Sequence, residues 1–149
     1  MSEEFNNKII KCKEAPYLAL SSCFFLYPLY IGFSCQVYNY SIPLLFSWVA
    51  SVNYWRNPRH SWRRDVDISF STISCIMFSY LFIFVLKNPI YYMNIVGAYS
   101  LFRKSSLLFE QDCPHWWKYH VLFHLVSSWN TYIVLQHVCL SKAREHGGS

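Results

Sequence analysis

Five apolar runs separated by short polar segments dominate the sequence. They cover approximately residues 17–37, 42–55, 66–86, 90–102 and 119–140. A helix that crosses a bilayer needs about 20 predominantly apolar residues, and the third run meets this length best. The fourth run is short, so it either crosses the bilayer or dips in and returns, and we expect it to cross. The pattern predicts an all-α, multi-pass transmembrane helix bundle with about five spans.

The whole chain, residues 1–149, is predicted to form a single integral membrane domain. Residues 1–16 would form a polar amino-terminal tail, residues 17–140 the transmembrane bundle, and residues 141–149 a polar carboxyl-terminal tail. Hydrophobic residues make up 54% and charged residues 14% of the chain, a balance that favours solvation by lipid. The six cysteines form no Cys-x-x-Cys pair. We therefore interpret them as small buried side chains and not as disulfides or metal ligands.

The thirteen basic residues are unevenly divided between the two predicted membrane surfaces. With the amino terminus inside, the inner ten are Lys8, Lys11, Lys13, Arg56, Arg59, Arg63, Arg64, Arg103, Lys104 and Lys118, and the outer three are Lys87, Lys142 and Arg144. Positively charged loops stay on the inner side of a membrane, so this bias predicts the amino terminus inside and the carboxyl terminus outside. Since these residues lie between apolar runs and form no continuous basic face, no nucleic-acid partner is predicted.

Polar side chains recur on one face of three predicted helices, near the inner surface. The sets are Ser47 and Ser51 in the second helix, Asp67, Ser71 and Ser74 in the third, and His120, His124, Ser127 and Thr131 in the fifth. Ionisable residues at membrane depth are costly and mark candidate functional sites. Two histidines one helical turn apart can both reach a single metal ion. Asp67 is their predicted partner, with Ser51 nearby, and His60 is either a third metal ligand or a solvated loop residue.

The order of these residues resembles the CREST superfamily of membrane hydrolases and receptors, which includes alkaline ceramidases and adiponectin-receptor relatives. The matching pieces are Ser51 with Tyr54-Trp55, then Asp65 or Asp67, then His120-Val-Leu-Phe-His124. The resemblance covers about a third of the chain. It implies a Zn²⁺ ion held by histidines and a bound water that attacks an amide or ester of a lipid substrate. Trp55 stands where the family pattern has its first histidine ligand.

Two functions follow from these observations. The first is a shortened, CREST-like, zinc-dependent lipid hydrolase at the inner membrane face, with Asp67 and Ser51 as catalytic residues and His120, His124 and His60 as metal ligands. The alternative is a non-catalytic structural, lipid-binding or assembly protein of the membrane, whose polar cluster only packs the bundle. A transporter is disfavoured, because the outer halves of the spans offer little polarity beyond Asn94 and scattered serines.

Overall fold

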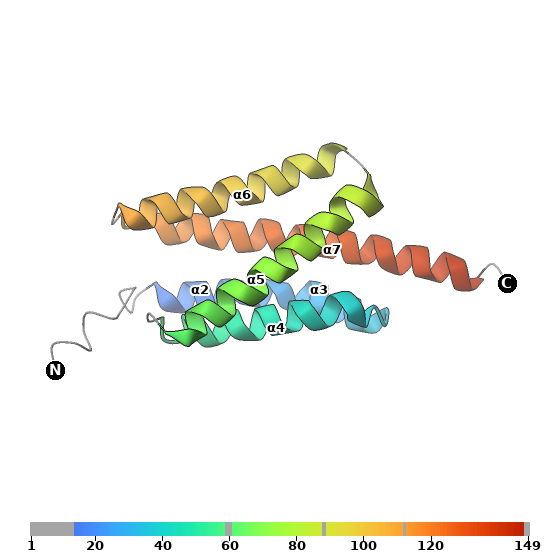
Figure 1. The fold of residues 1–149 in the computed structure, drawn as a ribbon, viewed down its shortest axis with the longest axis horizontal. Helices are drawn as coiled ribbons and strands as arrows, with labels where there is room; N and C mark the ends of the chain where they lie inside the picture. The colour runs from blue at the N-terminus through green and yellow to red at the C-terminus, as the bar shows by residue number, and fades with distance from the viewer. Residues whose placement is uncertain (1–13, 59–60, 88, 112, 148–149) are drawn as a thin grey trace.

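The computed structural model describes residues 14–58, 61–87, 89–111 and 113–147, and all regular elements within these ranges are helical (Figure 1). The first rod consists of α2 (Ala15–Ser22), a 3-10 turn η1 (Cys23–Phe25) and α3 (Leu26–Ser34), and the second is α4 (Tyr38–Trp55). The third rod is α5 (Trp62–Tyr80), which continues as the π-helix η2 (Leu81–Leu86), followed by α6 (Pro89–Glu110) and α7 (Trp116–Gly147).

The rods run alternately in opposite directions, so the chain turns sit at two ends of the bundle (Figure 1). The first rod packs against both α4 and α7, while α5 packs on α4 and α6 packs on α7. We call one end the basic end. Its described basic residues are Arg56, Arg63, Arg64, Arg103, Lys104 and Lys118. The opposite end contains the turn at 35–37 and Lys87.

Backbone conformation explains where two of the rods stop. Gln36 and Lys87 adopt left-handed conformations, with φ of 57° and 49°, which end a helix because the next residue cannot continue its hydrogen bonding. Pro89 then takes the first position of α6, where its missing N–H costs nothing. Residues 38–41, which lie between the first two apolar runs, form the first turn of α4. The reversal between the first two rods is correspondingly tight.

A proline within the first rod is accommodated by a neighbouring helix. Pro28 cannot donate to the carbonyl of Phe24, four residues earlier, and clashes with it. The chain winds as a 3-10 helix at Cys23–Phe25, and the hydroxyl of Ser128 on α7 donates a hydrogen bond of 2.7 Å to the freed Phe24 oxygen. The backbone group that proline leaves unpaired is therefore satisfied by a side chain from another rod.

Two apolar cores hold the rods together. The core at the basic end consists of Leu18, Tyr54, Trp55 and Trp116. The other core consists of Leu29, Val37, Leu44, Phe78, Leu81, Phe82, Val134 and Leu135. Between these two cores, along the same rods, lie the polar residues of the candidate site described below.

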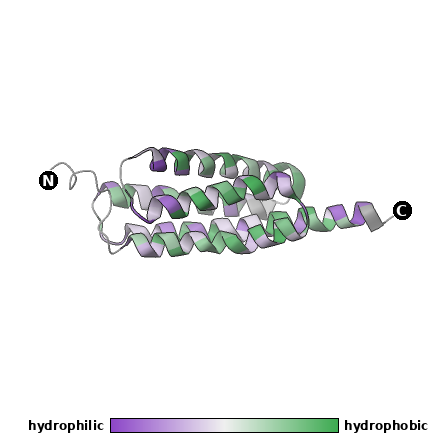
Figure 2. Cartoon of the chain, turned by 90° about the horizontal axis from the view of Figure 1, so that it is seen from below, coloured by the Kyte–Doolittle hydropathy of each residue, from purple (hydrophilic) through white to green (hydrophobic). Residues whose placement is uncertain are grey.

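Large hydrophobic side chains are also exposed on the outside of every rod. Leu20, Ile76 and Met93 are 68%, 66% and 70% exposed, and Trp129 on α7 is 59% exposed. Figure 2 shows that hydrophobic residues recur along the length of the rods. Two helices, Ala15–Ser34 and Trp62–Leu86, are long and apolar enough to cross a membrane. The prediction of an all-helical chain is confirmed, and the fourth apolar run lies in one continuous helix of 22 residues.

The interpretation of all six cysteines as isolated side chains is wrong for two of them. Cys35, at the end of α3, forms a disulfide with Cys139 on α7, across a sequence separation of 104 residues and a Cα–Cα distance of 5.6 Å. Cys23, Cys75 and Cys113 are free thiols. The apolar surroundings of Cys35 and Cys139 conceal the pairing in the sequence, because only the packing of the first rod on α7 brings the two together.

Candidate functional site

The two predicted histidines are neighbours on the first turns of α7. The ring centroids of His120 and His124 lie 4.8 Å apart. Nδ1 of His124 is 2.8 Å from the hydroxyl oxygen of Ser21, and Nδ1 of His120 is 3.4 Å from that of Ser105. His124 is only 6% exposed, so its hydrogen bond to Ser21 is made away from water.

The serine hydroxyls determine which ring nitrogen carries the proton. Ser21 donates its own hydrogen to the carbonyl of Leu18 at 2.9 Å, and Ser105 donates to the carbonyl of Trp116 at 3.3 Å. A hydroxyl has a single hydrogen to donate, so the serine oxygens must accept from Nδ1–H of the two neutral imidazoles. We therefore assign the Nδ1–H tautomer to both rings, which leaves Nε2 as the nitrogen able to accept a proton or bind a metal ion.

A second group of polar side chains surrounds Asp67 near the start of α5. The Asp67 carboxylate interacts with the hydroxyls of Ser51 on α4 and Ser71 on α5, and the Ser71 bond is 3.4 Å long. Ser51 lies 3.0 Å from the hydroxyl oxygen of Ser22, and Ser71 lies 3.4 Å from that of Ser47. A carboxylate only accepts hydrogen bonds, so Ser51 and Ser71 donate to Asp67, whereas the Ser22 hydroxyl donates to the carbonyl of Leu18 at 3.0 Å.

Ser21 and Ser22 join the histidine group to the aspartate group. These adjacent residues in the last turn of α2 are 2% and 0% exposed. Ser21 turns toward α7 and Ser22 turns toward α4. Neither serine is predicted from the sequence, because two serines inside an apolar run resemble ordinary helix positions. One feature of the sequence could have indicated them: no other neighbouring pair of polar residues lies in the middle of the first apolar run.

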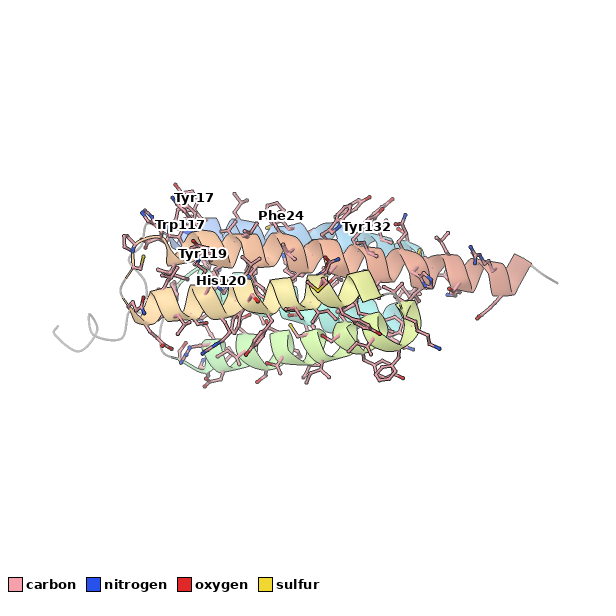
Figure 3. The ribbon with its side chains drawn as sticks, turned by 90° about the horizontal axis from the view of Figure 1, so that it is seen from above. Tyr17, Phe24, Trp117, Tyr119, His120 and Tyr132 are labelled. Carbon is pink, nitrogen blue, oxygen red and sulfur yellow. A yellow bond between two sulfur atoms is a disulfide. The ribbon has the colours of Figure 1, made fainter. Side chains whose placement is uncertain are left out.

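Trp55 closes the site on the side of the basic end. Its ring lies edge-on to His120, with centroids 5.2 Å apart, and its side chain is 7% exposed. The indole Nε1 has no hydrogen-bond partner within the part of the chain that the structure describes. Trp55 therefore fills the space beside His120 with a bulky aromatic ring. Figure 3 shows His120 near the start of α7, at the same end of the bundle as Trp117.

The described residues do not complete a zinc site of the usual kind. Catalytic Zn²⁺ sites have three protein ligands and an open position for water. His120 and His124 supply two nitrogens, whereas the carboxylate of Asp67 is engaged by serines. Among the described residues no group of three or more His, Cys, Asp or Glu side chains is placed to hold a metal ion. His60, the third predicted ligand, lies outside the described residues, so zinc binding stays a prediction.

The three predicted polar stripes contribute unequally to the site. Ser51 and Asp67 come together as predicted, and so do His120 and His124. The two pairs are linked through the missed Ser21 and Ser22, and all the hydrogen bonds found at the imidazoles go to serines.

The outer members of the stripes do not belong to the site. Ser74 donates to the carbonyl of Pro43 at 3.4 Å. Thr131 donates to the backbone oxygen of Ser127 in its own helix at 2.9 Å. The polar site is therefore confined to a short section of the rods between the two apolar cores.

Comparison of the chain with models of protein families, with curated proteins and with solved structures gives no match.

Proposed function

We propose that the chain is a multi-pass integral membrane protein of five spans, with the basic end on the inner side. Support comes from the exposed hydrophobic side chains on every rod, which would be unfavourable in water and are suited to lipid. The polar side chains of the site, by contrast, face one another between the rods. The last helix, with 32 residues, is about 48 Å long and exceeds the hydrocarbon thickness of about 30 Å.

We further propose that the protein is non-catalytic and acts by binding lipid or another membrane protein, with its polar site holding the rods in place. One observation carries this proposal. The serine hydroxyls supply hydrogen-bond partners for Asp67, His120 and His124 from four different rods. Hydrogen bonds between membrane helices contribute modestly each, about 0.6 kcal/mol on average, but a connected set fixes which faces of the helices meet.

Zinc analysis of the detergent-purified chain tests this proposal. We expect near-zero zinc in the wild type and in His124→Ala alike. Ser106→Ala is the matched control, because Ser106 is only partly buried and, among the described residues, its hydroxyl donates to the carbonyl of Phe102 in its own helix. Stoichiometric zinc in the wild type and in Ser106→Ala, lost in His124→Ala, would overturn the purely structural interpretation of the site.

That outcome would support the second candidate function, a zinc-dependent hydrolase of lipid amides or esters. The observation that favours it is the shared tautomer of His120 and His124. Metal-binding histidines generally donate their other ring N–H to a fixed acceptor, which orients the ring and raises its basicity. Release of fatty acid from a lipid ester or amide by the purified chain, abolished in His124→Ala and retained in Ser106→Ala, would establish this activity.

A further inference from the structure

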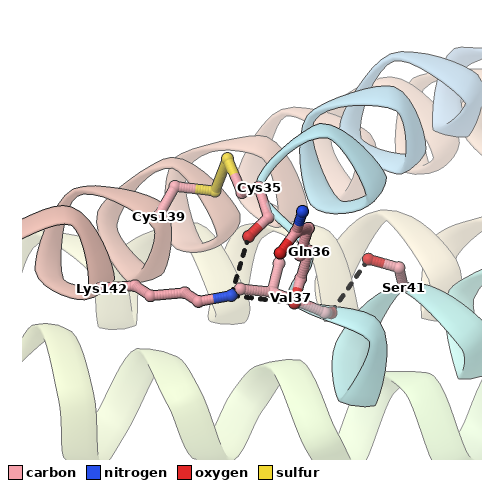
Figure 4. Close-up of a disulfide and its surroundings, with 6 residues drawn as sticks. All are labelled: Cys35, Gln36, Val37, Ser41, Cys139 and Lys142. Carbon is pink, nitrogen blue, oxygen red and sulfur yellow. Dashed lines mark hydrogen bonds between the residues drawn. A yellow bond between two sulfur atoms is a disulfide. The ribbon is translucent and has the colours of Figure 1, made fainter. Parts of the chain in front are cut away.

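The end of the bundle opposite the basic end is fastened by a covalent and an electrostatic link. The disulfide between Cys35 and Cys139 ties the end of α3 to α7 (Figure 4). Lys142, one helical turn beyond Cys139, donates from Nζ to the carbonyl oxygens of Cys35 and Gln36, each at 3.2 Å. We call this set, Cys35, Gln36, Cys139 and Lys142, the clasp. It holds the turn between the first two rods against the last helix.

A free thiol lies at the other end of the bundle. Cys113 is partly buried in the connection between α6 and α7 and is unpaired. This connection belongs to the basic end, where six described basic residues gather, while Lys87, Lys142 and Arg144 are the described basic residues of the clasp end. The oxidised cysteines and this free cysteine are therefore separated by the length of the bundle. The free cysteine lies at the end with more basic residues, and the disulfide lies at the end with fewer.

We propose that the two ends face compartments of opposite redox state, with the clasp in an oxidising compartment and Cys113 in a reducing one. Disulfides persist in secretory, periplasmic and extracellular spaces and are rare in the cytosol. Charge bias and cysteine oxidation are independent properties, and here they give the same orientation. This inference rests on the proposed membrane insertion.

Closing the clasp requires an oxidant, which we assign to the class of protein disulfide donors of that compartment. One cysteine thiolate attacks the donor disulfide and forms a mixed disulfide, and the first donor thiolate leaves. The thiolate of the other cysteine then attacks the protein-side sulfur, forming the Cys35–Cys139 bond and releasing the donor as a dithiol. Two electrons and two protons pass from the protein to the donor. The donor is thereby reduced to a dithiol as the two cysteines are oxidised to a disulfide.

Alkylation of the chain in two preparations tests the orientation. Intact cells expose the outer face to the reagent, and sealed inverted membrane vesicles expose the inner face. The probe is a membrane-impermeant maleimide carrying a polymer that shifts the mobility of the chain on a gel. From the outer face we expect no adduct until an impermeant phosphine reductant is added, and two adducts afterwards. From the inner face of a chain carrying Cys12→Ser, which removes the cysteine of the amino-terminal tail predicted on that side, we expect one adduct that needs no reductant. The Cys113→Ser variant should lose the inner adduct alone, and Cys35→Ser/Cys139→Ser the outer adducts alone.

The possible failures are distinguishable. Cys35 and Cys139 that react without reductant, or that react from the same face as Cys113, would overturn the redox inference while leaving a membrane protein. Extraction with alkaline carbonate tests insertion separately. A chain released by carbonate would overturn both the proposed insertion and the inference that depends on it. Should the double cysteine variant fail to accumulate, the reductant dependence of the wild type and the loss of the inner adduct in Cys113→Ser still decide the outcome.

Discussion

The hydroxyl of Ser128 donates a hydrogen bond to the backbone oxygen of Phe24, on a rod more than a hundred residues away in sequence. This oxygen is the one that Pro28 deprives of its helical partner. The 3-10 turn in the first rod and the serine on α7 are therefore two parts of one arrangement, because the serine supplies the partner that the proline removes.

Replacing Ser128 by alanine should destabilise the fold. The Phe24 oxygen would be left without a partner in a partly buried position, which costs up to about 1–3 kcal/mol. Ser106→Ala removes a hydroxyl that donates within its own helix turn and should change little. Unfolding of both variants in detergent, measured against the wild type by circular dichroism, checks the difference. Equal midpoints for the two variants would mean that the 3-10 turn satisfies Phe24 without Ser128.

Gly32 and Gly97 should respond in opposite ways to alanine. A methyl group at Gly32 would overlap the hydroxyl of Ser41, which is fully buried, and would contact Leu135 at 3.4 Å. Such overpacking costs about 1–3 kcal/mol. At Gly97 an added methyl meets nothing within 4 Å, and alanine favours a helix interior by about 1 kcal/mol. We expect Gly32→Ala to lower the thermal midpoint and Gly97→Ala to leave it unchanged or raise it. A stable Gly32→Ala would show that α3 and α4 can separate without loss.

Ser51 and Asp67 should be energetically coupled. Truncating Ser51 to alanine removes a donor to the Asp67 carboxylate, and Asp67→Ala removes the acceptor that orients Ser51. The double variant should therefore be less destabilised than the sum of the single variants, by about 0.5–2 kcal/mol. The control pair is Ser69→Ala with Asp67→Ala, because Ser69 is exposed and bonds to the backbone of Asp65. If the effects of Ser51→Ala and Asp67→Ala simply add, Ser51 does not interact with Asp67 and is not part of the site.

The two chain termini should be found on opposite sides of the membrane. The division of basic residues predicts the amino terminus on the inner side, and an odd number of spans then places the carboxyl terminus outside. Protease digestion of intact and of permeabilised membranes, with a different epitope tag at each terminus, checks this. Protection of both tags in intact membranes would replace the five-span arrangement with an even number of spans.

The rods could be predicted from the sequence because apolar runs bounded by polar turns leave few other solutions. Their bounds were less predictable. Hydropathy placed the end of the fourth span near residue 102, whereas α6 continues to Glu110, since a helix need not stop where its surroundings become polar. This extension carries Ser105 into the site beside His120, where the sequence reasoning expected a loop.

The site was predictable where its members share a helix and unpredictable where they do not. His120 and His124 meet because four residues make about one turn. The roles of Ser21 and Ser22 depend on how the first rod packs between α4 and α7, which no local pattern encodes. The Cys35–Cys139 bond likewise depends on how the first rod packs against α7. Both are long-range contacts, fixed by the packing of whole helices.

The π-helical end of the third rod gives the chain tolerance to a change in length. In a π-helix each hydrogen bond spans five residues, so the turn of Leu81–Leu86 holds about one residue more than an α-helical turn. Deleting one residue there can be absorbed if the turn rewinds as α-helix, and α6 keeps its position against α7. The same deletion elsewhere in α5 would rotate every following side chain by about 100° and turn its exposed hydrophobic residues inward. Insertions and deletions in this chain should therefore be tolerated at this turn far better than in the rest of the third rod.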